Sequence, residues 1–195
     1  MALDIEPLQA PLGAMVRGWN PAKSLSEAER QTVSGALQQY LVLLFRGQPY
    51  VTDEQLIGFA HQFGDLLRGS AFLESARENP EILIVGNLVG EDGKPRGAGG
   101  AFNIDWHADY SYVDRVGKTS FLNAVELPRD PPRTYFVSQY HALETLPKET
   151  VEKLRGLRAF HSIAGYGGGV DSERLQADIE RDRERGTERP PIPEA

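Results

Sequence analysis

The chain has 195 residues, of which 40% are hydrophobic and 25% charged, and its net charge at pH 7 is −7. This composition is typical of a globular domain, and the acidic balance argues against nucleic acid or an anionic membrane as a partner. The absence of cysteine excludes disulfides, thiolate metal sites and cysteine nucleophiles, so any bound metal must take nitrogen and oxygen ligands.

The N-terminal stretch MALDIEPLQAPLG carries acids where a secretory signal would carry basic residues. No apolar run approaches the roughly 20 residues that span a membrane. By default we therefore expect a cytoplasmic protein.

Two helices are predicted in the first third of the chain. Ser26 followed by Glu29 is a capping-box pattern and predicts a helix that continues to about Tyr40. Thr52 followed by Gln55 is a second capping box and predicts another helix.

Apolar runs predict strands on either side of the second helix. LVLLF (41–45) and EILIVGNL (81–88) are continuous runs, as in strands covered on both faces. The Gly-rich, charged stretch 89–101 predicts a mobile loop. Further strands are expected at 118–127 and 133–140.

The later part of the chain is predicted to contain a helical stretch over 148–154 and a strand over 158–165. The whole pattern is α+β, and its later strands suit a barrel or jelly roll that lacks a closing strand. Residues 166–195 form a charged segment in which only Leu175 and Ile179 could anchor a helix. We expect this segment to be mobile, because it buries too little apolar area to offset its ordering entropy.

A candidate metal site lies in FNIDWHADYSYVD (102–114). On a strand, residues i and i+2 point to the same face, so His107 and Asp109 would offer an imidazole and a carboxylate to one point. Two histidines and one carboxylate form the facial triad of non-haem Fe(II) oxygenases. By itself the triplet is a weak signal, and the alternative is a histidine bonded to a neighbouring carboxylate at the end of a strand.

The context of the triplet resembles the taurine dioxygenase / chlorophenoxyacetate dioxygenase (TauD/TfdA) family of Fe(II)- and 2-oxoglutarate-dependent oxygenases. The similarity covers about residues 10–165 in the family's order. It rests on the stretches LGAMVRGWN, LVLLFRGQ, TDEQLIGFAHQFG, NPEILIVGN, WHADYSYVDRVGKTSFLNAVELP, TYF and LRGLRAFHS. It implies that residues 1–165 are the N-terminal part of a double-stranded β-helix (jelly roll) with flanking helices, incomplete at its C-terminus.

The resemblance also implies roles for individual residues. His107 and Asp109 fall on two of the three iron ligands, and Thr134 on a threonine that bonds a carboxylate of 2-oxoglutarate. Asn103 matches a position that contacts substrate in relatives. Tyr110 is a candidate substrate contact, although an aromatic side chain beside a strand more often belongs to the core. The cofactors implied are Fe(II), 2-oxoglutarate as co-substrate, and O2.

The chain departs from the family pattern in two places. Residues 130–133 read Asp-Pro-Pro-Arg where the family usually has Gly-Gly-Asp, and prolines restrict the backbone where glycines are free. The distal iron-binding histidine and the arginine that pairs with 2-oxoglutarate lie beyond residue 195 in relatives. We expect a C-terminal segment or a second chain to supply them, with His161 as the alternative third ligand.

The function implied is hydroxylation, or a related C–H oxidation, of a small anionic organic substrate, coupled to decarboxylation of 2-oxoglutarate. One alternative is a catalytically incomplete homologue that acts as a binding or partner subunit. Another is cupin-like metal binding without redox chemistry. The identity of the substrate is not encoded in these motifs.

Overall fold

The computed structural model describes residues 3–67, 79, 81–94, 97–99, 106–111, 116–131, 133–159, 161 and 172–185. The chain divides into two compact units. Unit 1 comprises Met1–Leu83 and Phe121–Gly156, and unit 2 comprises Ile84–Ser120 and Leu157–Ala195.

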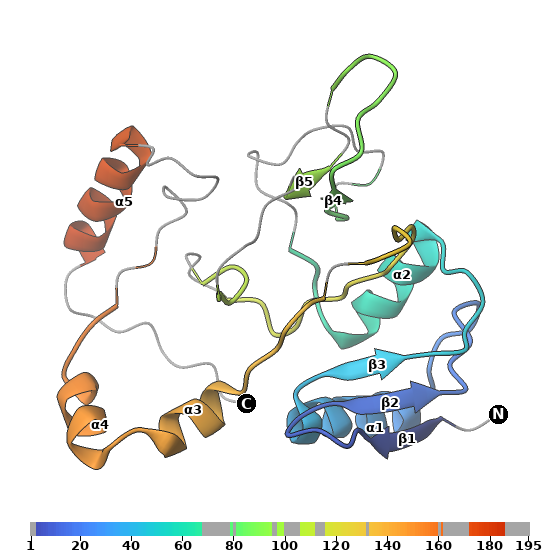
Figure 1. Ribbon diagram of the computed structural model, residues 1–195, viewed down its shortest axis with the longest axis horizontal. Coiled ribbons are helices and arrows are strands. Elements are labelled where there is room, and N and C mark those ends of the chain that lie inside the picture. Colours follow the sequence, from blue (N-terminus) through green and yellow to red (C-terminus); the bar gives the residue numbers. More distant parts are fainter. Residues whose placement is uncertain are drawn as a thin grey trace. The chain divides into compact units, whose positions relative to one another are not determined.

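Unit 1 contains a three-stranded sheet in the order β1-β2-β3 (Figure 1). Strand β1 (Asp4–Pro7) pairs antiparallel with β2 (Ala14–Arg17), and β2 pairs parallel with β3 (Leu43–Phe45). The register places Val16 opposite Phe45. Because β2 is the central strand, Val16 is fully buried.

The strand predicted at 41–45 exists, but the prediction that both its faces are covered is wrong. β3 lies at the edge of this sheet, and its three residues are only half-buried. A continuous apolar run indicates a strand, but the burial of that strand depends on neighbours that the run does not encode.

Both predicted helices of unit 1 are confirmed, including their capping boxes. Helix α1 spans Glu27–Tyr40, and α2 spans Asp53–Ala60 and continues as the 3-10 turn η1 (His61–Phe63). Leu41 is the C-cap of α1, and its φ of 67° lies in the left-handed region that is uncommon for leucine. The chain thereby turns directly from α1 into β3.

The capping box of α1 also lowers the pKa of Glu29. The Ser26 hydroxyl donates to the Glu29 carboxylate at 2.7 Å and the Ser26 backbone N–H at 2.8 Å. Both hydrogen bonds hold the pKa of Glu29 below its usual value, and the bond from the Ser26 hydroxyl has the larger effect. The ionised Glu29 carboxylate therefore stabilises the folded protein at pH values above its usual pKa. This contribution is lost as the pH falls through the lowered pKa.

The core of unit 1 is an aromatic cluster. Trp19, Val51 and Phe59 are buried together, and the ring centroids of Trp19 and Phe59 are 4.4 Å apart. Phe45 from β3 and Phe63 from η1 pack against them. The sheet and α2 are thus joined through one set of side chains.

Replacing Thr52 by alanine should destabilise the protein by about 1 kcal/mol, the typical cost of losing an N-cap. The Thr52 hydroxyl accepts from the backbone N–H of Gln55 at 3.3 Å, and α2 carries Phe59 into the core. Urea unfolding would measure the loss. Thr32→Ala is the matched control, because Thr32 is an exposed threonine inside α1 whose hydroxyl donates to a carbonyl of its own helix. An equal loss in both variants would contradict a specific role of the cap.

The predicted strand 81–88, whose residues from Ile84 onward belong to unit 2, is reduced to a short one. Strand β4 is only Val85–Gly86, and it pairs parallel with β5 (Ala98–Gly99). A Cβ at Gly97 would meet backbone atoms of Ile84 and of β4 at 3.0 Å, so this close pairing favours glycine there. Within 81–88 several apolar side chains are exposed, which corrects the prediction of a fully covered strand.

The strands predicted at 118–127 and 133–140 are not formed. Residues 116–131 and 133–137 take no strand conformation, and α3 (Gln139–Thr145) replaces the end of the second prediction. Their apolar side chains are exposed: 74% for Leu122 and 67% for Tyr135. A strand needs a partner for its backbone hydrogen bonds, and the described part of the chain pairs none with these segments.

The remaining helices agree with the sequence pattern in part. Helix α4 (Lys148–Arg155) confirms the helical stretch predicted at 148–154. Helix α5 (Ser172–Arg185) lies in the charged segment, where a Gln176–Glu180 side-chain hydrogen bond joins successive turns. The mobility of residues 166–195 stays a prediction. Of the helices in the described ranges, none has the length and apolarity needed to cross a bilayer.

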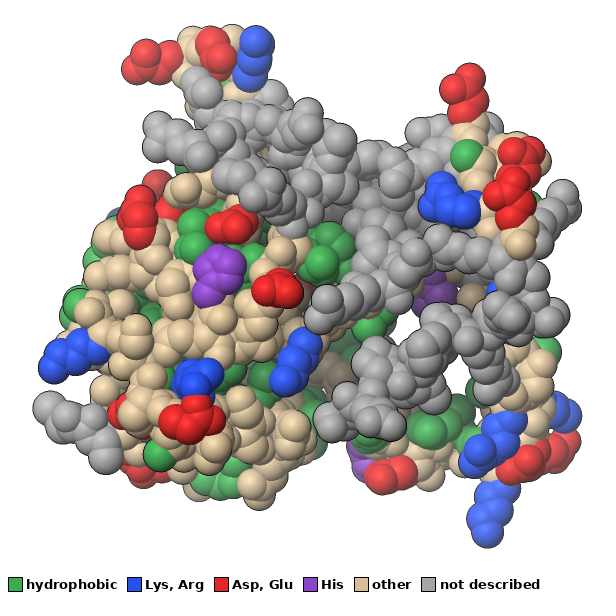
Figure 2. Space-filling view, turned by 180° about the vertical axis from the view of Figure 1, so that it is seen from behind, with side chains coloured by type: hydrophobic (Ala, Val, Ile, Leu, Met, Phe, Trp, Pro, Cys, Tyr) green, Lys and Arg blue, Asp and Glu red, His purple; other side chains and the backbone are tan. Residues whose placement is uncertain are grey.

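Much apolar surface is exposed on the described residues. Figure 2 shows hydrophobic side chains at the surface beside charged ones. Among the exposed hydrophobic residues of the described ranges are Val125, Phe136 and Tyr140, which are 57–71% exposed. These side chains lie in segments that the sequence predicts as strands. They are exposed because the described residues include no strand that pairs with those segments.

Candidate metal site

His107 and Asp109, the two predicted iron ligands, lie together in unit 2. The Nε2 atom of His107 is 3.3 Å from Oδ1 of Asp109, and both side chains are 52% exposed. The pair therefore presents one nitrogen and one oxygen donor to a position that solvent can reach.

The local structure of this pair differs from the prediction. Residues 106–111 form a bend and a turn rather than a strand, and Tyr110 has a φ of 55°, in the left-handed region. A bulky residue with this φ is uncommon and turns the chain sharply. The two donors thus converge because the backbone turns at Asp109, and not because alternate residues of a strand share a face.

Ser120 is a neighbour of this site that the sequence analysis missed. Its hydroxyl donates to Oδ2 of Asp109 at 2.8 Å. The two oxygens of the carboxylate therefore have different neighbours: Oδ2 accepts a hydrogen bond from Ser120, and Oδ1 lies near His107. A serine eleven positions away carries no sequence signal for this contact, which depends on the tertiary structure.

The separation within the pair is that of a direct His–Asp ion pair, and it is also compatible with two ligands of one divalent metal. Metal–nitrogen and metal–oxygen bonds are about 2.1 Å long, so two ligands at a right angle on one ion lie about 3 Å apart. The observed 3.3 Å between Nε2 and Oδ1 needs only a small side-chain adjustment. Imidazole and carboxylate are also the donor types of non-haem iron sites.

The other three histidines, His61, His141 and His161, are not part of the His107–Asp109 pair. His61 is 3.9 Å from Glu81, and His141 is 3.7 Å from Glu144, both in unit 1. His161 is exposed. Within the described ranges, no third His, Asp or Glu joins His107 and Asp109 in a group that could hold a metal.

The remaining predicted site residues are Thr134, Tyr110 and Asn103. Thr134 belongs to unit 1 and is exposed, so its hydroxyl is accessible. Tyr110 follows the ligand pair directly and is half-buried. Asn103 lies outside the described residues.

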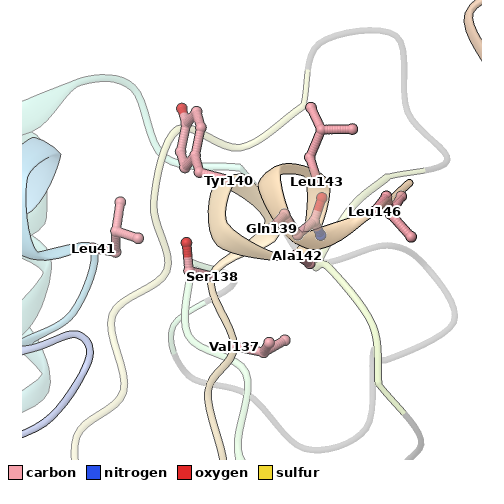
Figure 3. A pocket seen from close by; sticks show the side chains of 8 residues that line it. All are labelled: Leu41, Val137, Ser138, Gln139, Tyr140, Ala142, Leu143 and Leu146. Carbon is pink, nitrogen blue, oxygen red and sulfur yellow. The ribbon is translucent and has the colours of Figure 1, made fainter. Parts of the chain in front are cut away.

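A separate hollow of about 760 Å³ lies in unit 1. Figure 3 shows the side chains that line it, which come from the end of α1 and from α3 with its flanking residues: Leu41, Val137, Ser138, Gln139, Tyr140, Ala142, Leu143 and Leu146. This lining includes no His, Asp or Glu and is largely apolar. The hollow therefore lacks the donors of a metal site.

Comparison with known proteins identifies the family. The model of the family "Taurine catabolism dioxygenase TauD, TfdA family" matches residues 4–192. The chain belongs to this family. The match includes the His107–Asp109 pair and nearly the whole sequence, and it confirms the resemblance drawn from the motifs.

Two curated relatives support the same membership. Pentalenolactone F synthase of Streptomyces avermitilis is 34% identical over 175 residues, which are 88% of this chain and 57% of that protein. The alpha-ketoglutarate-dependent 2,4-dichlorophenoxyacetate dioxygenase of Burkholderia sp. (strain RASC) is 35% identical over 147 residues, 71% of this chain and 49% of that protein. A crystal structure of a taurine dioxygenase from Burkholderia xenovorans matches at 29% identity with a TM-score of 0.35, over 41% of this chain and 27% of that one. The chain spans about half the length of the curated relatives it matches.

Proposed function

We propose that the protein is an Fe(II)- and 2-oxoglutarate-dependent dioxygenase that hydroxylates, or otherwise oxidises at a C–H bond, a small anionic organic substrate. The observation that carries the proposal is the 3.3 Å approach of His107 Nε2 to Asp109 Oδ1 in a chain of the TauD/TfdA family. An imidazole and a carboxylate at this separation suit two adjacent positions on one ion.

Each site residue has a distinct task in this proposal. His107 and Asp109 hold the iron, and Thr134 donates its exposed hydroxyl to a carboxylate of 2-oxoglutarate. Asn103 and Tyr110 contact the substrate. When bound, the iron with 2-oxoglutarate and O2 supplies the oxidant, and 2-oxoglutarate is decarboxylated to succinate.

Two protein ligands and one hydroxyl leave the site short of donors. We propose that a further histidine and an arginine, from a continuation of the polypeptide or from a second chain, complete it together with the jelly roll that residues 1–165 begin. The support is that the relatives are about twice as long as the part matched here. A neutral hydroxyl bond is also roughly half as strong as a charge-assisted one, so Thr134 alone would hold 2-oxoglutarate weakly.

The substrate class rests on the relatives. One of them is named for 2,4-dichlorophenoxyacetate, which is a carboxylate anion. We propose an anionic organic substrate for this protein on that basis. The relatives are named as a synthase and a dioxygenase, which favours an enzyme over the alternative of a non-catalytic partner subunit.

The test is oxygen consumption in the presence of Fe(II), 2-oxoglutarate and ascorbate. The 195-residue chain alone should consume little oxygen, and addition of the polypeptide that supplies the histidine and arginine should raise the rate. Decarboxylation of labelled 2-oxoglutarate should rise in parallel. Absence of 2-oxoglutarate decarboxylation by the completed protein would refute the proposal, and vigorous turnover by the chain alone would instead favour His161 as the third ligand.

A further inference from the structure

The hydroxyl of Ser120 lies against the proposed metal ligand Asp109. It donates to Oδ2 of the carboxylate at 2.8 Å, while Oδ1 of the same carboxylate is 3.3 Å from Nε2 of His107. Ser120 thus bonds the carboxylate oxygen other than the one that lies near the His107 nitrogen. The remaining oxygen is the one positioned to share an ion with that nitrogen.

A carboxylate without such a bond can present either oxygen, because its terminal torsion is broad and roughly two-fold. A hydrogen bond to one oxygen fixes the plane of the group and leaves the other oxygen as the ligand. Partners of this kind orient metal ligands, and their loss typically weakens metal binding by about 10- to 100-fold. Here the partner comes from a position eleven residues away along the chain.

The turn at the ligand pair makes this orientation more important. Residues 106–111 have no strand ladder to hold them, and Tyr110 takes a left-handed φ of 55°. The Asp109 side chain is also half exposed, so water competes for its oxygens. The bond from Ser120 is a direct link between this turn and the chain that follows it.

We propose that Ser120 is a positioning residue for the metal site: it holds the Asp109 carboxylate so that Oδ1 and the His107 nitrogen bind the same divalent cation. The inference rests on the proposed function, because it requires that His107 and Asp109 bind a metal. It adds a residue that acts on the metal through Asp109 and not by ligating it.

The experiment measures binding of Mn(II) alone to the full 195-residue chain, by the loss of the free Mn(II) electron paramagnetic resonance signal. Ser120→Ala should raise the dissociation constant roughly 10-fold, and Ser120→Thr, which keeps the hydroxyl, should restore it. Thr119→Val is the matched control: among the described residues the adjacent Thr119 hydroxyl makes no hydrogen bond to Asp109, so this variant should bind like wild type. Should Ser120→Ala fail to fold, Ser120→Gly, which also lacks the hydroxyl and adds no metal donor, carries the same expectation.

Thermal unfolding of each variant separates positioning from a purely structural role. A half-exposed bond contributes little to stability, so Ser120→Ala should weaken Mn(II) binding with little change in the unfolding temperature. Unchanged Mn(II) affinity in Ser120→Ala, with binding abolished in His107→Ala, would overturn the role of Ser120 and leave the metal site standing. If His107→Ala binds Mn(II) as wild type does, the proposed metal site fails, and the role of Ser120 fails with it.

Discussion

His107→Ala should weaken Mn(II) binding by at least about 100-fold, beyond the range seen when only a supporting partner of a ligand is lost. The reason is ligand count. The structure brings two donors together, His107 Nε2 and Asp109 Oδ1, and alanine leaves a single half-exposed carboxylate, which water and other cations can occupy. The fold should be preserved, because the imidazole is 52% exposed.

A matched control for this experiment is His141→Ala. His141 also pairs with a carboxylate, Glu144, at 3.7 Å, and both side chains are more than 70% exposed. The two histidines therefore differ in the arrangement around them and not in residue type or partner type. Equal loss of Mn(II) binding in the two variants would mean that the chain binds the ion through any surface histidine, and the assignment of the site would be wrong.

Phe59→Ala should destabilise the protein by about 3–5 kcal/mol, the usual cost of removing a buried phenylalanine ring. Phe59 is 5% exposed, and its ring lies 4.4 Å from Trp19, 5.4 Å from Phe45 and 5.8 Å from Phe121 between centroids. Its removal would leave a cavity and take away several edge-to-face contacts. Urea unfolding followed by tryptophan fluorescence measures the loss, because Trp19 reports on this cluster directly.

Phe136→Ala provides the comparison for the core. The same side chain is removed, but Phe136 is 57% exposed, so the cost should be below about 1 kcal/mol. A similar loss of stability in both variants would contradict the view that the cluster around Phe59 is the core of unit 1. Loss of stability in Phe59→Ala with unchanged Mn(II) affinity would further indicate that the core and the metal site are independent.

The elements predicted correctly depend on residues close together in the chain. The capping boxes at Ser26 and Thr52 are formed by residues three positions apart, and both helices begin where they were expected. The strand at 41–45 was also found, because a continuous apolar run favours extended structure. Its half-buried state was not foreseen, since burial depends on segments distant in sequence.

The elements predicted wrongly depend on distant partners. The apolar residues of 118–127 indicate a strand, but a strand forms only where another segment pairs with its backbone hydrogen-bonding groups. The described residues pair none with it, and Leu122 and Val125 stay exposed. Their sequence favours a strand, but the described residues supply no strand to pair with it.

The sequence by itself determined the family, the two capped helices and the identity of the candidate ligands, His107 and Asp109. These follow from residue types at short fixed spacings, which local geometry and chemistry constrain. The tertiary structure decided how the pair converges, through a turn at Tyr110 instead of a strand. It also placed the Ser120 hydroxyl on Asp109, because a side-chain contact between residues eleven positions apart depends on the path of the folded chain between them.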